Sequence, residues 1–296
     1  MDVASALLEH AEASGRRSIV VVGTGKNVGK TVTARALARA AAARGATIGF
    51  TSAGRDGEPV DMATSARKPR LPFAAGALLA TASDALRGSP AVEVLELWEG
   101  GGPLGRTAIV RVATPAAYAI AGPHTAAGIR AVIERMAQLG AAPIIVDGSV
   151  DRMAALAGGD DAVIVACGAA RGGSLAHIVE EVRAAVARLS LPLARAGEGI
   201  VHLGALTEAH LEAFIAARET RPIAIEDATK LFARPRLILR ARAALDLRVQ
   251  RAISVIACTV SAIDAERSYD VRALLDAVRA ATGVPAYDLF SGESAA

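Results

Sequence analysis

The chain has 296 residues, of which 52% are hydrophobic and 21% are charged, so it can bury a large core in one or two α/β domains. No stretch of about 18 apolar residues is free of charges and turn residues. The first residues also lack the basic-then-apolar order of a signal peptide. These features argue against a membrane protein, and we expect a cytoplasmic one.

A nucleic-acid partner is also disfavoured, although the net charge is +3 and the pI is about 9.1. The arginines are spread along segments that also carry Glu and Asp, instead of forming one basic block. Aromatic residues make up only 3% of the chain, which leaves no series of rings on which single-stranded bases would stack.

The predicted elements begin with a helix at residues 3–13 and a strand at 18–22. A helix rich in alanine and leucine follows at 31–44, and a short strand is predicted at 46–50. Residues 51–72 contain many Gly, Pro, Asp and Arg residues without a sustained period, which predicts a long loop. Long loops of this kind are often functional.

Apolar runs and helical segments continue to alternate toward the C-terminus. Further strands are predicted at 71–75, 92–97, 108–112, 117–121, 143–146, 162–166, 200–203, 222–225, 245–249, 253–258 and 285–287, and further helices at 125–139, 174–189, 207–217 and 270–281. Near-continuous apolar strands that alternate with helices are typical of a mainly parallel sheet with helices on both faces. We therefore expect an α/β fold.

The placement of the cysteines and histidines argues against a disulfide framework and against a zinc site. Cys167 and Cys258 each end a β-branched apolar run, so we expect buried residues at strand ends and no disulfide framework. The five histidines show no spacing typical of zinc ligands, and no Gly-x-Ser-x-Gly motif is present.

The most informative segment is Val20-Val-Val-Gly-Thr-Gly-Lys-Asn-Val-Gly-Lys-Thr31, in which an apolar strand runs into a glycine-rich turn and then a helix. Glycines let backbone N–H groups close around phosphate oxygens, Lys30 can reach the outer phosphates, and the Thr31 hydroxyl can bind magnesium. The helix would direct its positive N-terminal end at the anion. The residues expected to bind a nucleotide are Gly23, Thr24, Gly25, Lys26, Asn27, Val28, Gly29, Lys30, Thr31 and Val32. A glycine-rich turn without such a function is the alternative.

In this segment the first glycine stands one residue before the position that the general Gly-x4-Gly-Lys-Thr pattern requires, and Thr24 takes that position. Read as Gly23-Thr24-x3-Val28-Gly29-Lys30-Thr31, the loop resembles that of dethiobiotin synthetase and its relatives of the cobyrinic acid diamide synthase group. The resemblance covers the loop well and the remainder loosely. It implies a P-loop NTPase fold that binds ATP and Mg²⁺.

Related division-site and nitrogenase-type ATPases carry a second lysine five residues before that of Gly-Lys-Thr. Here Gly25 takes that position and Lys26 follows it, so a lysine that acts in trans is not expected. Residues 1–195 are expected to form the nucleotide-binding domain. Residues 196–296 are expected to form a C-terminal α/β segment, either separate from the first domain or continuous with it, beginning at the glycine-rich link 197–199.

Asp147 ends the apolar run Pro143-Ile-Ile-Val-Asp147, at the carboxyl end of a predicted strand, where parallel sheets bind their ligands. An acid in this place has the form of a Walker B residue, which holds magnesium or its water opposite Thr31. The alternative is an Asx turn with Gly148 and Ser149. Because a phosphate-binding turn lies upstream, we favour the metal role.

The loop after the second strand carries Arg55, Asp56, Glu58 and Asp61. In proteins of the dethiobiotin synthetase type this loop has a lysine and then an aspartate that touch substrate and magnesium. The resemblance therefore implies that Asp56 or Asp61 completes the metal shell and that Arg55 holds a substrate carboxylate or a phosphate. A solvated charged turn explains each of these residues equally well.

Three other polar positions follow predicted strands. Arg152 is expected either to contact substrate or the γ-phosphate or to pair with Asp151. The loop 167–173 is expected either to flank the nucleotide base or a second ligand, or to leave Arg171 solvated. Residues 226–230 favour a helix cap over a ligand site.

These patterns predict a Mg-dependent ATP-binding protein with Lys30, Asp147 and Arg55 as catalytic residues and Thr31, Asp56 and Asp147 as metal ligands. ATP is preferred over GTP because the chain lacks an Asn-Lys-x-Asp motif.

Three activities remain open. One is an ATP-dependent ligase that acts on a small acid, as the resemblance implies. The second is an ATPase that maintains a partner protein, since the sequence is also similar to P-loop proteins that accompany cobalamin-dependent aminomutases. The third is a small-molecule kinase. Related folds dimerise, so a homodimer is expected.

Overall fold

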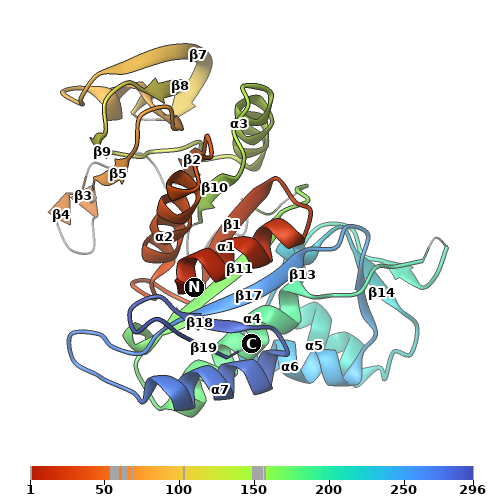
Figure 1. The fold of residues 1–296 in the computed structure, drawn as a ribbon. Helices are drawn as coiled ribbons and strands as arrows, with labels where there is room; N and C mark the ends of the chain where they lie inside the picture. The colour runs from red at the N-terminus through yellow and green to blue at the C-terminus, as the bar shows by residue number, and fades with distance from the viewer. Residues whose placement is uncertain are drawn as a thin grey trace. The chain divides into compact units, whose positions relative to one another are not determined.

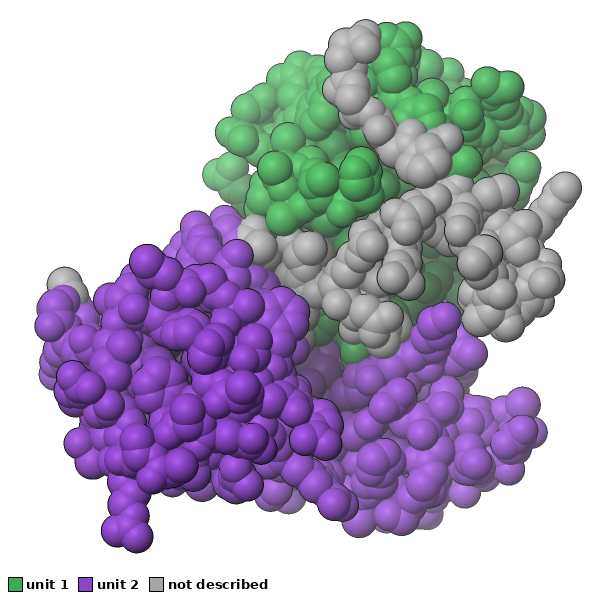
Figure 2. Space-filling view, turned by 180° about the vertical axis from the view of Figure 1, so that it is seen from behind, with its two compact units in different colours: residues 1–23, 30–155 green, residues 24–29, 156–296 purple. Residues whose placement is uncertain are grey.

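The computed structural model describes residues 2–53, 60–61, 66–67, 70–102, 104–148, 156, 158–195 and 197–295 (Figure 1). These residues form helices and mainly parallel strands, which confirms the predicted α/β class. The chain divides into two compact units (Figure 2). Unit 1 contains residues 1–23 and 30–155, and unit 2 contains residues 24–29 and 156–296.

The main sheet of unit 1 does not follow chain order. Its strands are, side by side, β1 (Ser18–Gly23), β10 (Ile144–Asp147), β2 (Gly49–Ser52), β6 (Leu78–Ala82), β8 (Gly105–Val112) and β7 (Val92–Gly102). The first four run parallel, and β8 and β7 are each antiparallel to their neighbours. Every residue of β1 except Gly23 is buried, as expected of a parallel strand covered on both faces.

The α-helices among the described residues of unit 1 are α1 (Val3–Ala13), α2 (Lys30–Ala43) and α3 (Ala126–Gln138). α1 packs against α2, and Arg44 beyond the end of α2 pairs with Glu9 and Glu12 of α1 at 2.8 and 3.3 Å. Thr125 caps α3 by accepting a hydrogen bond of 3.0 Å from the N–H of Gly128. The described residues of this unit also form two short antiparallel pairs, β3 (Val60–Asp61) with β4 (Ala66–Arg67) and β5 (Leu71–Phe73) with β9 (Ala116–Tyr118).

Unit 2 contains parallel strands of its own. β11 (Ala162–Gly168), β17 (Ser254–Ser261) and β18 (Ala286–Asp288) run parallel, and β19 (Glu293–Ala295) is antiparallel to β18. A smaller parallel sheet joins β12 (Ile200–Val201), β14 (Ile223–Ile225) and β16 (Leu247–Val249), and β13 (Leu206–Thr207) pairs with β15 (Leu231–Phe232). The helices are α4 (Leu175–Leu189), α5 (Glu208–Ala216), α6 (Pro235–Ala244) and α7 (Val271–Thr282), and α4 packs against α6 and α7.

Most elements predicted from periodicity are present, with ends shifted by a few residues. The helix predicted at 3–13 is α1, and the helix predicted at 174–189 is α4 with Ser174 as its N-cap. The main omissions are β6 and α6. In α6 the buried stripe consists of only Leu237, Ile238 and Ala241, and the neighbouring arginines (Arg236, Arg240 and Arg242) hid it in the sequence.

Both cysteines are free and fully buried, as predicted. Cys167 lies next to the end of β11, whereas Cys258 lies in the middle of β17 and not at the predicted strand end. Burial raises the pKa of the Cys167 thiol well above its ordinary value and that of Cys258 to about 12. Both thiols are therefore protonated near neutral pH, and neither is a reactive nucleophile.

The two units do not coincide with the expected division into residues 1–195 and 196–296. Gly197 and Gly199, in the expected link, lie inside unit 2 and have left-handed φ angles of 77°. The expected division remains a prediction about which parts fold independently. In the part of the chain that the structure describes, no helix is long and apolar enough to cross a membrane.

Candidate functional site

The glycine-rich loop (residues 23–31) and Asp147 follow adjacent strands of unit 1. β1 and β10 are parallel, and Val21 pairs with Asp147 across them. The strand that leads into the loop and the strand that carries the aspartate therefore end at the same edge of the sheet, where parallel sheets bind ligands. Gly148 packs so closely on β1 that a Cβ atom would lie 2.4 Å from the carbonyl oxygen of Val21.

Thr31 and Asp147 are in direct contact within unit 1. Thr31 is the second residue of α2, and its hydroxyl donates a hydrogen bond of 2.7 Å to Oδ2 of Asp147. These are two of the three residues to which the sequence assigns a metal role. The contact joins residues 116 positions apart, so it depends on the pairing of β1 with β10 and not on local structure.

The Thr31 and Asp147 side chains offer oxygen ligands that suit Mg²⁺. A hydroxyl and a carboxylate oxygen are hard donors, and Mg²⁺ is usually held by one or two protein groups together with waters and phosphate oxygens. The pair therefore fits the one or two protein ligands that a Mg²⁺ site of this kind requires. No group of three or more His, Cys, Asp and Glu side chains among the described residues is placed to hold a metal ion.

The glycine-rich loop contains two residues with left-handed backbone conformations, separated by one residue without a positive φ angle. Asn27 and Gly29 have left-handed φ angles of 58° and 94°, and Val28 between them does not. Alternation of this kind turns successive N–H groups toward a common point and forms a concave anion-binding nest. Asn27 is the only asparagine in the sequence, and asparagine is among the non-glycine residues that best tolerate a left-handed φ.

The first part of this loop is anchored within unit 2. The N–H of Thr24 donates a hydrogen bond of 2.9 Å to the carbonyl oxygen of Ala166 on β11, and Val28 is buried. Lys26 and Asn27 are exposed. The hydroxyl oxygen of Thr24 is buried without a hydrogen-bond partner among the described residues. Leaving such a group unpaired costs about 1–3 kcal/mol, so it favours a polar ligand at the loop.

Arg171 lies against the same part of the loop. A Cβ atom on Gly25 would lie 2.1 Å from Cδ of Arg171, which is far inside van der Waals contact. The guanidinium group forms a side-on pair with Glu181 of α4, in which Nε donates to Oε2 at 2.8 Å and Nη2 donates to Oε1 at 2.6 Å. Nε2 of His177 lies 3.5 Å from the same carboxylate.

Glu181 is a residue that sequence reasoning missed. It lies on the buried face of α4, three residues after Ile178 and directly before Val182. A carboxylate at such a position needs a partner, because an unpaired buried charge is strongly unfavourable. The position of Glu181 among the apolar residues of the predicted helix therefore indicated a paired carboxylate. It did not identify Arg171 as the partner.

Several expected site residues lie outside the described residues. These are Arg55, Asp56, Glu58, Asp151 and Arg152, and only the backbone of Asp61 is described, in β3. Lys30 and Val32 are described at the start of α2, where the sequence predicted them. The helix-cap interpretation of residues 226–230 is confirmed, since Asp227 accepts a hydrogen bond of 2.9 Å from the N–H of Thr229 in the 3-10 turn η4 (Ala228–Lys230).

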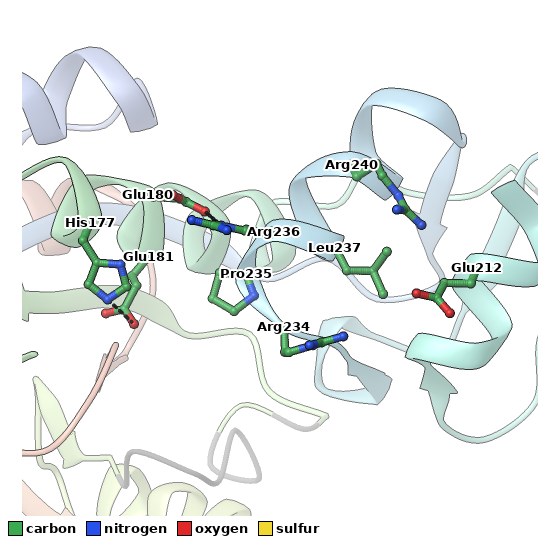
Figure 3. A pocket seen from close by; sticks show the side chains of 9 residues that line it. All are labelled: His177, Glu180, Glu181, Glu212, Arg234, Pro235, Arg236, Leu237 and Arg240. Atoms are coloured by element: carbon green, nitrogen blue, oxygen red, sulfur yellow. Dashed lines mark hydrogen bonds and ion pairs between the residues drawn. The ribbon is translucent and has the colours of Figure 1, made fainter. Parts of the chain in front are cut away.

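A pocket of about 480 Å³ lies in unit 2 between α4, α5 and the start of α6 (Figure 3). Its wall includes Glu181 and His177, and arginine and glutamate side chains line it in equal numbers. Two of those arginines are paired on the surface, Arg236 with Glu180 and Arg234 with Glu208, each at 3.0 Å. The pocket therefore has no marked charge of one sign.

Comparison of the chain with protein-family models, with curated proteins and with solved structures finds no match.

The contact between Gly25 and Arg171 leads to a prediction about stability. Gly25→Ala should destabilise the protein by about 1–3 kcal/mol, because the new methyl group must displace an arginine stem whose end is fixed by Glu181. Gly25 is not among the residues with positive φ, so backbone strain contributes no part of this cost. Chemical denaturation of the wild type and the variant measures the difference.

The control is the same substitution made in an Arg171→Ala/Glu181→Gln background, in which no buried carboxylate is left without its guanidinium partner. There the added methyl group meets no arginine, so Gly25→Ala should cost close to nothing. An equal cost in both backgrounds would show that Arg171 is not what requires glycine at position 25.

Proposed function

We propose that this protein binds Mg-ATP at the glycine-rich loop and hydrolyses or transfers the γ-phosphate. The observation that carries the proposal is the 2.7 Å hydrogen bond from Thr31 to Asp147. A strand, a glycine-rich turn that ends Gly29-Lys30-Thr31, a helix and an acid on the adjacent strand are together the working parts of a P-loop NTPase. The mainly parallel α/β architecture is compatible with that fold.

Phosphate binding would combine the loop backbone with Lys30. The backbone turns at Asn27 and Gly29 favour a nest of N–H donors, and the N-terminus of α2 adds the positive end of its dipole. Lys30, the first residue of α2, contributes a full positive charge. Charge-assisted hydrogen bonds are each worth about 1.5–3 kcal/mol, so a few of them account for micromolar nucleotide affinity.

Thr31 and Asp147 would hold Mg²⁺, either directly or through water. The ion, when bound, neutralises the charge that develops on the phosphate oxygens during transfer. Asp147 fixes the Thr31 hydroxyl through their hydrogen bond, and Gly148 lets β10 end close against β1. Among nucleotides we favour ATP. The guanine-reading Asn-Lys-x-Asp motif requires an asparagine outside the loop, and Asn27 is the only one in the chain.

For the reaction, we propose an ATP-dependent ligase of the dethiobiotin synthetase type. The pattern Gly23-Thr24-x3-Val28-Gly29-Lys30-Thr31 supports this choice, because it resembles the loop of those enzymes. The chemistry activates a carboxylate by phosphorylation, after which an amine displaces the phosphate. The second ligand would be a small acid. An ATPase that maintains a partner protein and a small-molecule kinase are the alternatives.

Lys30→Ala tests nucleotide binding. The variant should bind Mg-ATP at least about 100-fold more weakly, because a cation aimed at the phosphates is lost in a site built for negative charge. Its thermal unfolding midpoint should be nearly unchanged, since Lys30 lies in the first turn of α2 and not in the core. Titration calorimetry and thermal denaturation on the full chain measure both quantities.

Lys230→Ala is the matched control. Lys230 pairs with Glu226 at 3.3 Å, and its removal should leave the affinity for Mg-ATP unchanged. Wild-type protein that takes up no Mg-ATP, or equal losses in the two variants, would refute the assignment of the loop.

Asp147→Asn tests the metal role. Asparagine keeps the size of the side chain and can still accept the hydrogen bond from Thr31, but it lacks the charge that attracts Mg²⁺. With excess Mg²⁺ the variant should bind ATP about 10- to 100-fold more weakly than the wild type. With EDTA the two proteins should bind ATP alike, because neither holds the ion. A loss of the same size in both conditions would mean that Asp147 acts on the fold and not through a metal.

Phosphate release separates the three reaction classes. A ligase should release phosphate only when a carboxylate substrate is added, and its acyl phosphate should be trapped by hydroxylamine. A partner-directed ATPase should instead be stimulated by a co-purified protein. A kinase should give a stable phosphorylated product and little free phosphate. Absence of stimulation by any small acid, together with stimulation by a protein, would overturn the ligase assignment.

A further inference from the structure

The side chain of Arg171 packs against the glycine-rich loop at Gly25, where the loop has no side chain. Arg171 ends the 3-10 turn η3 (Ala169–Arg171) that follows β11, and the ideal Cβ position of Gly25 lies 2.1 Å from its Cδ and 3.1 Å from its Nη1. The backbone of Gly25 has an ordinary φ, so its conformation does not call for glycine. The missing side chain at position 25 instead makes room for the arginine.

Glu181 fixes the orientation of the guanidinium group. It accepts hydrogen bonds from Nε and Nη2, and Nη1 is therefore the terminal nitrogen that faces Gly25. The Glu181 side chain is 9% exposed, whereas that of Arg171 is 38% exposed. A side-on pair of this kind specifies the plane of the guanidinium as well as its position.

The turn that carries Arg171 is itself held in place within unit 2. Gly168 approaches the backbone of β17 so closely that a Cβ atom would lie 2.5 Å from the carbonyl oxygen of Ser261. On the other side of the turn, the hydroxyl of Tyr269 donates a hydrogen bond of 2.6 Å to the carbonyl oxygen of Gly173. A group held by its neighbours in this way needs little reorganisation to bind a ligand.

We propose that Arg171 provides a second cation for the nucleotide phosphates, from the same chain, and that Glu181 is the positioning residue that holds it against the loop. This inference rests on the proposed binding of Mg-ATP at the loop. Nucleotide phosphates carry several negative charges, and a planar guanidinium binds two phosphate oxygens through one face of its fork. Without nucleotide, Glu181 balances the charge of Arg171, so no unpaired cation is left against the loop.

A purely structural ion pair would behave differently when its members are changed. In that case removal of the arginine would lower stability and leave the affinity for nucleotide as it was. If Arg171 serves the phosphates, Glu181→Gln removes a negative charge close to them while its amide oxygen can still accept one hydrogen bond from Arg171. Affinity for Mg-ATP should then stay the same or rise up to several-fold. Removal of the arginine should lower it.

The test compares variants of the full chain by calorimetric titration with Mg-ATP. Arg171→Ala alone removes the guanidinium partner of the buried Glu181 carboxylate and could disturb folding. The double variant Arg171→Ala/Glu181→Gln removes both charges and avoids this effect. It should bind Mg-ATP at least about tenfold more weakly than Glu181→Gln alone, and Arg171→Lys should lie between the wild type and the double variant.

Arg221→Ala is the matched control. Arg221 pairs with Glu219 through the same two nitrogens, Nε and Nη2, at 2.9 and 2.8 Å, in the connection between α5 and β14. This variant should bind Mg-ATP like the wild type. Thermal denaturation of every variant shows which of them are folded. If the double variant is not folded, the affinity of Arg171→Lys compared with that of the wild type provides the test.

The outcomes separate this inference from the function on which it rests. Wild-type protein that does not bind Mg-ATP would refute the proposed function and this inference with it. If the wild type binds, Lys30→Ala does not, and the double variant matches Glu181→Gln, only the role of Arg171 is refuted. A drop in affinity with Glu181→Gln equal to that of the double variant would also refute it, because the two residues would then act as one structural unit.

Discussion

The register of β1 against β10 is the constraint on which the candidate site depends. Because Val21 pairs with Asp147, the aspartate ends its strand beside the strand that leads into the glycine-rich loop, and its carboxylate accepts a hydrogen bond from Thr31 in α2. A shift of one residue along β10 would turn the Asp147 side chain to the opposite face of the sheet. Gly148 secures this register, since only glycine fits so close to the carbonyl oxygen of Val21.

The loop between β1 and α2 is fitted to its surroundings by residue choice at three positions. Asn27 and Gly29 take left-handed conformations that most residues avoid, and Gly25 leaves room for Arg171. In the proposed function, the first two choices shape the backbone for an anion, and the third admits a charged side chain from a distant turn. Backbone conformation and side-chain charge therefore both support the proposed ligand, an anion such as a phosphate.

The local parts of this arrangement could be predicted from the sequence, and the long-range parts only in outline. The apolar run before Gly23, the spacing to Gly29-Lys30-Thr31 and the apolar run that ends at Asp147 identified the strands and the loop correctly. Helix α6 was missed because its arginines interrupt a short apolar stripe. The pairing of Arg171 with Glu181 and its approach to Gly25 arise from tertiary packing of β11, α4 and the loop, for which periodicity gives no information. The expected roles of Arg55 and Asp56 fall outside the described residues and stay predictions.

A crystal structure of the full chain with Mg²⁺ and a non-hydrolysable ATP analogue tests the central claim most directly. We predict that phosphate oxygens accept hydrogen bonds from the N–H groups of the glycine-rich loop, that the ammonium of Lys30 lies beside them, and that Thr31 and Asp147 hold Mg²⁺ directly or through water. A nucleotide bound elsewhere, or a loop filled by the protein's own side chains in the presence of saturating analogue, would contradict it.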